Sequence, residues 1–416
     1  MFMISINSQQ KTILSNMLAL FTLQGLQYLI PLILLPYLVH TLGIAYFGLL
    51  SFATATIAFF RSTVAYGFDF TGTKQIALQK EDKSALSDIL SSILMVKLLL
   101  VGITFFILII LIFSLEKISI ESTLFLYTFL VVLGDALFPT WFFQGVEKMK
   151  FITLFKTLQR VISLILILLF VTTQEDYLLV PLIEGFLAIM AGLGSLLYIK
   201  KAFNVGFKIP QKTNIIFQIK NSWHLFLSQI AVHFYTTMNI FVLGLMADNT
   251  TVGYYALAYK LFSVIQELFS PVTKAIFPFL SKKYLEHKTD YYKLIQKISL
   301  WYLLALAIVA FLSYVFASEI VNLVSGKPIE QTASLLKIFS VSLLFAIGPL
   351  YSLLLIIKSD NKKLSVITFR CMILNSILLY PSIYYFGIVG LSYHFLIVQL
   401  YHAYLQIKFN KEVWIK

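Results

Sequence analysis

Several cations lie inside long apolar segments of the sequence. A charge at the centre of a bilayer costs about 2.5–3.5 kcal/mol on insertion scales, so a charge at that depth is a candidate functional group. We expect five of them to bind an anionic group inside a water-filled cavity: Lys97, Lys260, Lys274, Arg61 and Arg370. Pairing with neighbouring acids is the alternative for the lysines. For the two arginines, which lie nearer the ends of their segments, the alternative is extension to the lipid headgroups.

Three carboxylates lie among the same apolar segments. Asp135, Glu184 and Glu267 are candidates for proton coupling, because a carboxylate in a low-dielectric cleft can carry a proton near neutral pH. The alternative is that they balance the charge of nearby lysines. Lys260, Glu267 and Lys274 follow one another at intervals of seven residues. This spacing predicts that the three share one face of a single helix.

The composition indicates which elements must hold these charges. Of the 416 residues, 59% are hydrophobic and 12% charged, with a mean hydropathy of +0.87. Soluble domains have about 25% charged residues, so a soluble enzyme, a disordered chain and a receptor with one span are excluded. We predict an all-α integral membrane protein with about twelve transmembrane helices, at 15–39, 45–66, 87–113, 120–143, 152–173, 178–199, 222–246, 252–278, 298–317, 332–357, 364–384 and 388–407.

The distribution of lysines supports this count and predicts an orientation. If the N-terminus is cytoplasmic, the tails and loops on that side hold 22 lysines, whereas the opposite loops hold only Lys117 and Lys327. Lysine and arginine accumulate in cytoplasmic loops, so we expect both termini in the cytoplasm. The same rule accounts for the net charge of +13 without nucleic acid as a partner. Lys156 and Arg160, near the start of a predicted span, are interpreted as anchors at the membrane interface.

The two halves of the chain are weakly similar to each other. At an offset of 205 residues, seven identities fall within about fifty positions, among them Asn16 with Asn221. Six spans per half would give both halves the same orientation. We therefore predict two six-helix lobes, 1–205 and 206–416, related as a parallel repeat around a central cavity.

Three stretches have a distinctive spacing of residue types: PYLVHTLGIAYFGLLSFA from Pro36, YGFDFTGTKQIA from Tyr66 and FPTWFFQGVEKMKFIT from Phe138. They resemble the first outer loop, the first cytoplasmic loop and the segment leaving the fourth span of polysaccharide transporters. The residues that carry the resemblance are Gly43, Gly48, Lys74, Pro139, Trp141, Gln144, Gly145 and Glu147. His40 departs from the pattern, because arginine is usual there, and Lys74 stands where an arginine is common. The family that the chain resembles is the Wzx-type O-antigen or capsule repeat-unit flippase, in the multidrug/oligosaccharidyl-lipid/polysaccharide exporter superfamily.

This resemblance implies a transporter rather than an enzyme. Its cargo would be undecaprenyl-pyrophosphate-linked oligosaccharide, moved by alternating access from the cytoplasmic to the periplasmic leaflet of the bacterial inner membrane, with proton coupling left open. The implied partners are this cargo and membrane lipid, with a polysaccharide polymerase and a chain-length regulator as further candidates. No cofactor or metal is expected, since Cys371 is the only cysteine and no metal motif is present.

Two other functions remain as alternatives. A drug or cation antiporter of the same superfamily would have a cavity dominated by acids, whereas the intramembrane charges here are mostly cations. A membrane-embedded polysaccharide polymerase or glycosyltransferase would be expected to carry a sizeable outer loop. The longest loop here, 200–221, has only about 22 residues and is predicted to be cytoplasmic, which favours transport.

Overall fold

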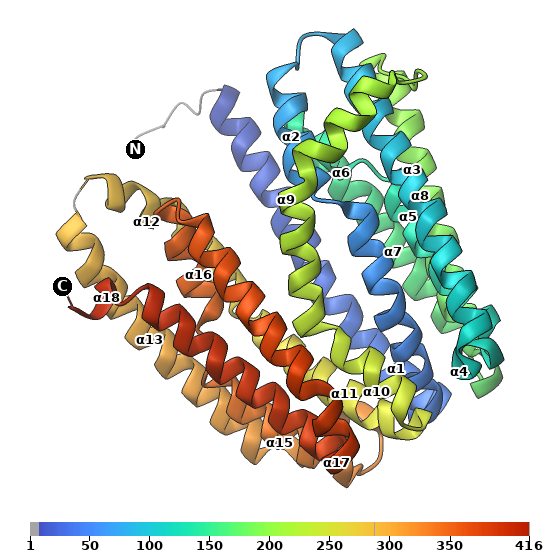
Figure 1. Ribbon diagram of the computed structural model, residues 1–416, viewed down its shortest axis with the longest axis vertical. Coiled ribbons are helices and arrows are strands. Elements are labelled where there is room, and N and C mark those ends of the chain that lie inside the picture. Colours follow the sequence, from blue (N-terminus) through green and yellow to red (C-terminus); the bar gives the residue numbers. More distant parts are fainter. Residues whose placement is uncertain (1–7, 287, 416) are drawn as a thin grey trace, which may run out of the picture. The chain divides into compact units, whose positions relative to one another are not determined.

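Helices make up all of the regular structure in the described part of the chain. The computed structural model describes residues 8–286 and 288–415, and its elements there are α-helices and one short 3-10 helix (Figure 1). Eight of the described helices are long and apolar enough to cross a membrane, or nine if one bent pair counts as a span. The prediction of an all-α, multi-pass membrane protein is therefore confirmed.

The chain divides into two compact units. Unit 1 comprises Met1–Gly43 and Ala53–Ile230, and unit 2 comprises Ile44–Phe52 and Ala231–Lys416. The helices that begin in unit 1 are α1 (Ser8–Ala65), α2 (Phe68–Leu78), α3 (Lys83–Ser114), α4 (Glu116–Ile120), α5 (Ser122–Leu137), α6 (Thr140–Gly145), α7 (Lys150–Phe170), the 3-10 helix η1 (Gln174–Leu178), α8 (Leu179–Phe203) and α9 (Lys212–Thr236). The helices that begin in unit 2 are α10 (Met238–Met246), α11 (Asn249–Glu267), α12 (Ser270–Glu286), α13 (Lys288–Val315), α14 (Ala317–Ser325), α15 (Glu330–Leu343), α16 (Gly348–Ile357), α17 (Asn361–Phe409) and α18 (Glu412–Ile415). The prediction that residues 1–205 and 206–416 form two lobes related as a repeat is not tested by this division and stays a prediction.

The two longest helices are each kinked at a glycine. The backbone of α1 leaves the helical conformation at Gly43 (φ 77°, ψ 168°), and that of α17 does so at Gly387 (φ 59°, ψ −148°). Residues with a side chain rarely adopt a positive φ, so glycine is the residue that permits each kink. The kink in α1 falls between the predicted spans 15–39 and 45–66, and the kink in α17 falls between the last two predicted spans. Each long helix thus corresponds to two predicted spans.

Other predicted spans consist of two helices separated by a short break. Segment 120–143 corresponds to α5 and α6, and segment 332–357 corresponds to α15 and α16. Segment 222–246 corresponds to α9 and α10, which are bent by 49°. Segment 252–278 forms most of α11 and α12 and is not among the described helices apolar enough to span a membrane. The total of twelve therefore stays a prediction.

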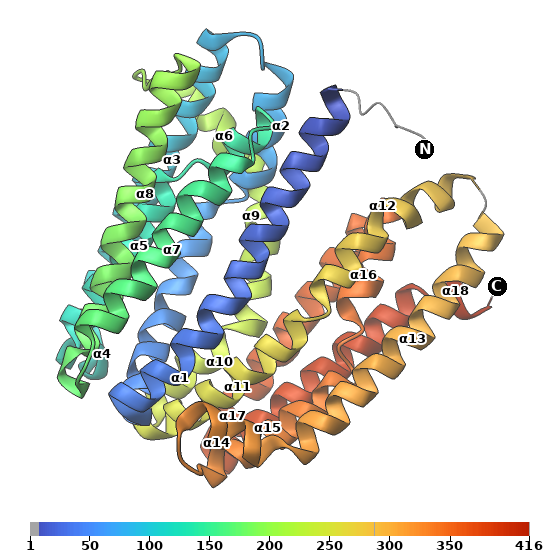
Figure 2. The same cartoon turned by 180° about the vertical axis from the view of Figure 1, so that it is seen from behind.

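The packing of unit 1 centres on α2, α3 and α6. Trp141, Phe142 and Phe143 of α6 are fully buried, and they pack with Phe68 and Ile76 of α2 and with the first turns of α3 in one apolar cluster. Both α5 and α7 pack along α8, as Figure 2 shows from behind. The short helix α6 is thus held firmly at the end of α5, where the charged residues described below come together.

Connections predicted to be cytoplasmic lie together within each unit. In unit 1, Lys208 lies 3.7 Å from Asp88 and Lys80 lies 3.2 Å from Glu147, whereas α4 lies at the opposite end of the unit (Figure 1). The first pair joins the α8–α9 connection to the second turn of α3, and the second pair joins the α2–α3 connection to the α6–α7 connection. The side of the membrane that they face stays a prediction.

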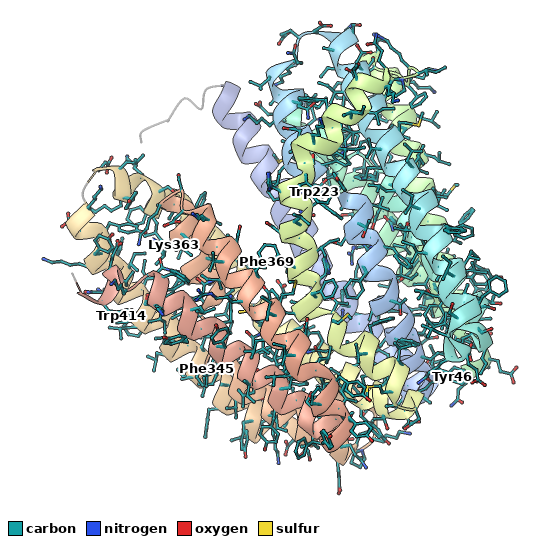
Figure 3. All side chains as sticks on the ribbon, in the orientation of Figure 1. Tyr46, Trp223, Phe345, Lys363, Phe369 and Trp414 are labelled. Carbon is teal, nitrogen blue, oxygen red and sulfur yellow. The ribbon has the colours of Figure 1, made fainter. Side chains whose placement is uncertain are left out.

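In unit 2 as well, segments predicted to be cytoplasmic lie together at one end. Glu412 of α18 accepts a hydrogen bond from Tyr292 of α13 at 2.6 Å and lies 3.5 Å from Lys358, which follows α16. Lys363 and Trp414, both labelled in Figure 3, also lie toward this end of the unit. The first turns of α13, the end of α16 and the helix α18 are thus gathered in one place.

Candidate functional site

A carboxylate in unit 1 joins cations from two other helices. Asp135, in the last turn of α5, forms an ion pair with Arg61 of α1, whose Nη2 lies 2.7 Å from Oδ2. Arg61 Nε donates to the same oxygen at 2.9 Å. Lys156 of α7 approaches Oδ1 at 3.2 Å. The Arg61 side chain is 47% exposed, so one of the two cations keeps about half of its surface accessible.

Lys97 of α3 contacts the same residue through its backbone. Its side chain is 5% exposed, and its Nζ donates to the Asp135 carbonyl oxygen at 3.0 Å. In a continuous helix that carbonyl would accept from the N–H of residue 139, but residue 139 is a proline and has none. Lys97 therefore supplies the hydrogen bond that Pro139 cannot, at the point where α5 ends.

Further charges surround these four residues. Asp69 of α2 interacts favourably with Lys97, as does Asp135. Glu184 of α8 interacts electrostatically with both Arg61 and Arg160. We define the charge cluster as Arg61, Asp69, Lys97, Asp135, Lys156, Arg160 and Glu184. With four cations and three acids, the cluster carries a formal charge of +1 and is close to balanced.

The charge cluster is suited to exchanging one anion for another. The Arg61 guanidinium has planar, forked donors that match the oxygens of a carboxylate or a phosphate. An incoming phosphate would compete with Asp135 for these donors. Lys156 is held nearby, with its Nζ 4.6 Å from the centre of the Phe138 ring. Among the residues that the structure describes, no three His, Cys, Asp or Glu side chains are grouped to hold a metal ion.

The predicted charges of unit 2 are spread over three helices. Lys260 and Glu267 are exposed on α11, and Arg370 is exposed on α17. The expectation of one continuous charged helix face is corrected, because α11 ends at Glu267 and a separate helix, α12, follows. Pro271, in the first turn of α12, has no N–H to donate to the Glu267 carbonyl. The side chain of Lys274 lies outside the described part of the structure.

Three members of the charge cluster are not recognised from the sequence, and one of them is Arg160, which interacts with Glu184 and is interpreted above as an interfacial anchor. Lys156, interpreted above as an interfacial anchor, is an ion-pair partner of Asp135. Asp69 is absent from the predicted set, although a single acid in the otherwise uncharged stretch from Tyr66 to Gly72 is a visible signal. In all three cases the partner lies far away in the sequence, so spacing alone does not reveal the pairing.

The second and third motifs pack against each other. Thr73 of α2 donates to Gln144 Oε1 at 3.0 Å. A Cβ on Gly145 would lie 2.5 Å from the Ile76 side chain, and Trp141 is fully buried. These residues therefore join α2 to α6, next to the end of α5 that carries Asp135.

The remaining motif residues act on the backbone or lie at the surface. Gly43 is the kink in α1, and a Cβ on Gly48 would collide with the backbone of α11 at Gly253. Glu147 has a positive φ of 58° and pairs with Lys80 outside the helices. Lys74 is exposed on α2. Pro139, as described above, ends the hydrogen-bond pattern of α5.

Comparison with known proteins assigns the family. Residues 13–284 match the family described as polysaccharide biosynthesis protein. The chain belongs to this family. An Escherichia coli K12 relative named "Putative O-antigen transporter" is 27% identical over 387 residues, covering 92% of this chain and 93% of the relative. A Shigella dysenteriae protein of the same name is 31% identical over 275 residues, covering 64% and 67%. The resemblance found in the three motifs is thus confirmed.

Solved membrane transporters share the fold of this family member. An inward-facing multidrug-resistance MATE transporter of the MOP superfamily has a TM-score of 0.73 and 14% identity, covering 92% of this chain and 94% of its own. The lipid II flippase MurJ has a TM-score of 0.71 and 14% identity, covering 96% and 87%. At this identity the likeness concerns the fold alone. All four relatives are named as transporters or flippases, in agreement with the prediction of transport rather than catalysis.

Proposed function

We propose that the protein is a flippase for undecaprenyl-pyrophosphate-linked oligosaccharide repeat units. It moves them by alternating access from the cytoplasmic to the periplasmic leaflet of the bacterial inner membrane, with both of its termini in the cytoplasm. The charge cluster is the observation that carries the proposal, because it places an accessible guanidinium beside a carboxylate within the membrane-spanning part of a polysaccharide biosynthesis protein. The candidate protein partners are a polysaccharide polymerase and a chain-length regulator.

Arg61 is the residue that we assign to the diphosphate. In the absence of cargo its donors are occupied by Asp135, which offsets part of the cost of holding a cation at this depth. A diphosphate offers more oxygens and more negative charge, so it can displace the carboxylate and bind Arg61 in a forked geometry. Lys156 remains with Asp135 after the exchange, so the carboxylate is not left without a partner. Lys97 positions the end of α5 and is not itself part of the exchange.

The other predicted residues keep distinct roles in this proposal. Lys260, Lys274 and Arg370 of unit 2 are further candidates for contacts with the anionic cargo. Glu184 and Glu267 are the better candidates for proton coupling, because Asp135 would first have to lose two ion pairs to take up a proton.

The experiment is complementation of cells that lack the protein. Without it, we expect surface polysaccharide to disappear and lipid-linked repeat units to accumulate in the cytoplasmic leaflet. An Arg61→Gln variant should restore little polysaccharide, since a hydrogen bond to a charged group is worth about 1.5–3 kcal/mol, or roughly 10–100-fold in binding. Surface polysaccharide at the wild-type level in the deletion strain would contradict the proposal.

A charge-balanced variant separates binding from folding. Arg61→Gln combined with Asp135→Asn leaves the net charge of the charge cluster unchanged, and Lys156 then has a neutral amide as its neighbour in place of its ion pair with Asp135. We expect this double variant to accumulate to wild-type levels and still fail to restore polysaccharide. Full restoration by the double variant would show that Arg61 serves only to balance Asp135.

A further inference from the structure

Unit 2 contains a cavity that is separate from the charge cluster. Its volume is about 370 Å³, and its walls come from α9, α11, α16 and α17. This size falls at the lower end of the range of about 300–1,000 Å³ found for small-molecule sites. All of the lining residues belong to unit 2. The arrangement of the lining residues is therefore defined within one compact unit.

Two helix breaks border this cavity. Between α9 and α10 the chain bends by 49° next to Thr236, which lines the cavity. Between α15 and α16 the helix is interrupted over residues 344–347, which include Phe345, labelled in Figure 3, and the first two residues of α16, Gly348 and Pro349, line the cavity. Irregular backbone at membrane depth is tolerated where it is buried in protein or lines a water-filled space. Breaks in two helices at one cavity are typical of a binding site.

The lining is rich in hydrogen-bonding groups and carries no fixed charge. Tyr235, Tyr259, Gln266, Gln399 and His402 contribute hydroxyl, amide and imidazole groups. These groups both donate and accept, and the tyrosine rings add apolar surface. None of the lining residues that the structure describes is Lys, Arg, Asp or Glu. A phosphate in this position would therefore be desolvated without a counter-charge, which is costly.

The imidazole in the cavity wall is held in place on two sides. His402 packs against Gly348 so closely that a Cβ there would collide with its Cε1. On its other side, His402 Nε2 lies 3.2 Å from Gln406 Nε2, which in turn donates to Ser352 at 2.7 Å. The Tyr235 ring lies 6.3 Å from the imidazole, measured between centroids. The polar wall is thus preorganised by packing and by its own hydrogen bonds.

We propose that this cavity binds an uncharged, hydroxyl-rich group, namely a sugar ring of the transported glycan. The inference rests on the proposed function and extends it, because it separates recognition of the glycan in unit 2 from recognition of the diphosphate by Arg61 in unit 1. Amide and imidazole groups match the hydroxyls of a sugar, and the aromatic rings match its apolar face. Glycan specificity would then lie in the residues that line this cavity.

The test measures binding of two probes to purified protein in nanodiscs. One probe is the oligosaccharide repeat unit released from the lipid carrier of the same cells, without phosphate, and the other is inorganic pyrophosphate. Gln399→Leu and Thr236→Val each remove hydrogen-bonding groups at nearly constant volume. We expect each to weaken oligosaccharide binding roughly tenfold and to leave pyrophosphate binding unchanged. Gln331→Leu, on an exposed face of α15, is the matched control and should bind both probes like the wild type.

The outcomes distinguish this inference from the proposed function. Oligosaccharide binding that is equal in Gln399→Leu, Thr236→Val and Gln331→Leu, or absent from the wild type, overturns the cavity assignment even if lipid-linked cargo is still moved. Loss of oligosaccharide binding in Arg61→Gln alone would assign the glycan to unit 1 and also overturn it. Conversely, wild-type protein that binds oligosaccharide at the cavity but moves no lipid-linked cargo would overturn the proposed function and leave the binding site standing.

Discussion

The contact between Lys97 and the Asp135 carbonyl predicts a specific coupling with Pro139. Lys97→Met keeps the length of the side chain but removes the donor, so the carbonyl loses its partner in a buried place. Leaving a buried acceptor unsatisfied costs about 1–3 kcal/mol, and removing one partner from a set of buried charges costs about 3–5 kcal/mol. Because the lost bond is to a backbone carbonyl and Asp69 keeps part of its surface in contact with solvent, we expect a loss of about 3 kcal/mol in the free energy of unfolding.

Replacing the proline should recover part of this loss. Pro139→Ala restores an N–H at the position that can donate to the Asp135 carbonyl, and it removes the restriction that proline imposes on Phe138. In the background of Lys97→Met, we therefore expect Pro139→Ala to restore about 1 kcal/mol, the usual net worth of one hydrogen bond. In the wild-type background the same change should not stabilise, because Lys97 already satisfies the carbonyl.

The assay is unfolding of the purified protein in detergent, followed for the two single variants and the double variant. The coupling free energy is the change in the free energy of unfolding caused by the double variant minus the sum of the changes caused by the two single variants. Lys83→Met, at the exposed start of the same helix, is the control and should change stability by less than about 0.5 kcal/mol. Effects of Lys97→Met and Pro139→Ala that simply add would refute the assignment of Lys97 to the helix break.

Three further predictions concern other parts of the fold. Asp248 caps α11 by accepting from the Thr251 hydroxyl at 2.6 Å and from Thr251 N at 2.9 Å, and these two hydrogen bonds hold the pKa of Asp248 below its usual range. Asp248→Ala should therefore lower the free energy of unfolding by about 1 kcal/mol at pH 7. The difference in stability between wild type and Asp248→Ala should persist at pH values above about 3.9, the pKa of an aspartate in the unfolded chain. It should vanish as the pH falls through the lower pKa that Asp248 has in the folded protein. A difference in stability that grows on acidification would contradict this. Gly145→Ala places a Cβ against Ile76 and should cost roughly 1–3 kcal/mol, so an unchanged melting temperature would exclude the close packing of α2 on α6. Lys208→Ala removes an exposed ion pair worth about 0–1 kcal/mol and should leave surface polysaccharide unchanged; a strong defect would mean that this connection recognises cargo or a partner.

Local signals in the sequence are enough to predict the class of fold and several of its helix kinks and breaks. The length and apolarity of the segments indicate spanning helices, and the kink at Gly43 falls between two predicted spans. The break before α6 follows from Pro139, which lacks an N–H. These features depend on residues close together in the chain, so periodicity and composition reveal them.

The organisation of the charges depends on contacts between distant segments. Arg61 and Asp135 are 74 residues apart, and no spacing rule links them. Lys97 is singled out from the sequence as an intramembrane cation, but its hydrogen-bond partner is a backbone carbonyl, and a backbone group cannot be recognised from residue types. The continuous face predicted for Lys260 and Glu267 with Lys274 fails because a helix break resets the periodicity on which that inference depends.

The central claim is that this protein moves a lipid-linked oligosaccharide. The most direct test is translocation of undecaprenyl-pyrophosphate oligosaccharide from the source cell in proteoliposomes, with and without an imposed pH gradient. We expect movement with the wild-type protein and a roughly 10–100-fold lower rate with Arg61→Gln combined with Asp135→Asn. Acceleration by the gradient would support Glu184 or Glu267 as coupling sites. No movement of a cognate, correctly oriented substrate by folded protein would contradict the account and favour an antiporter of the same fold.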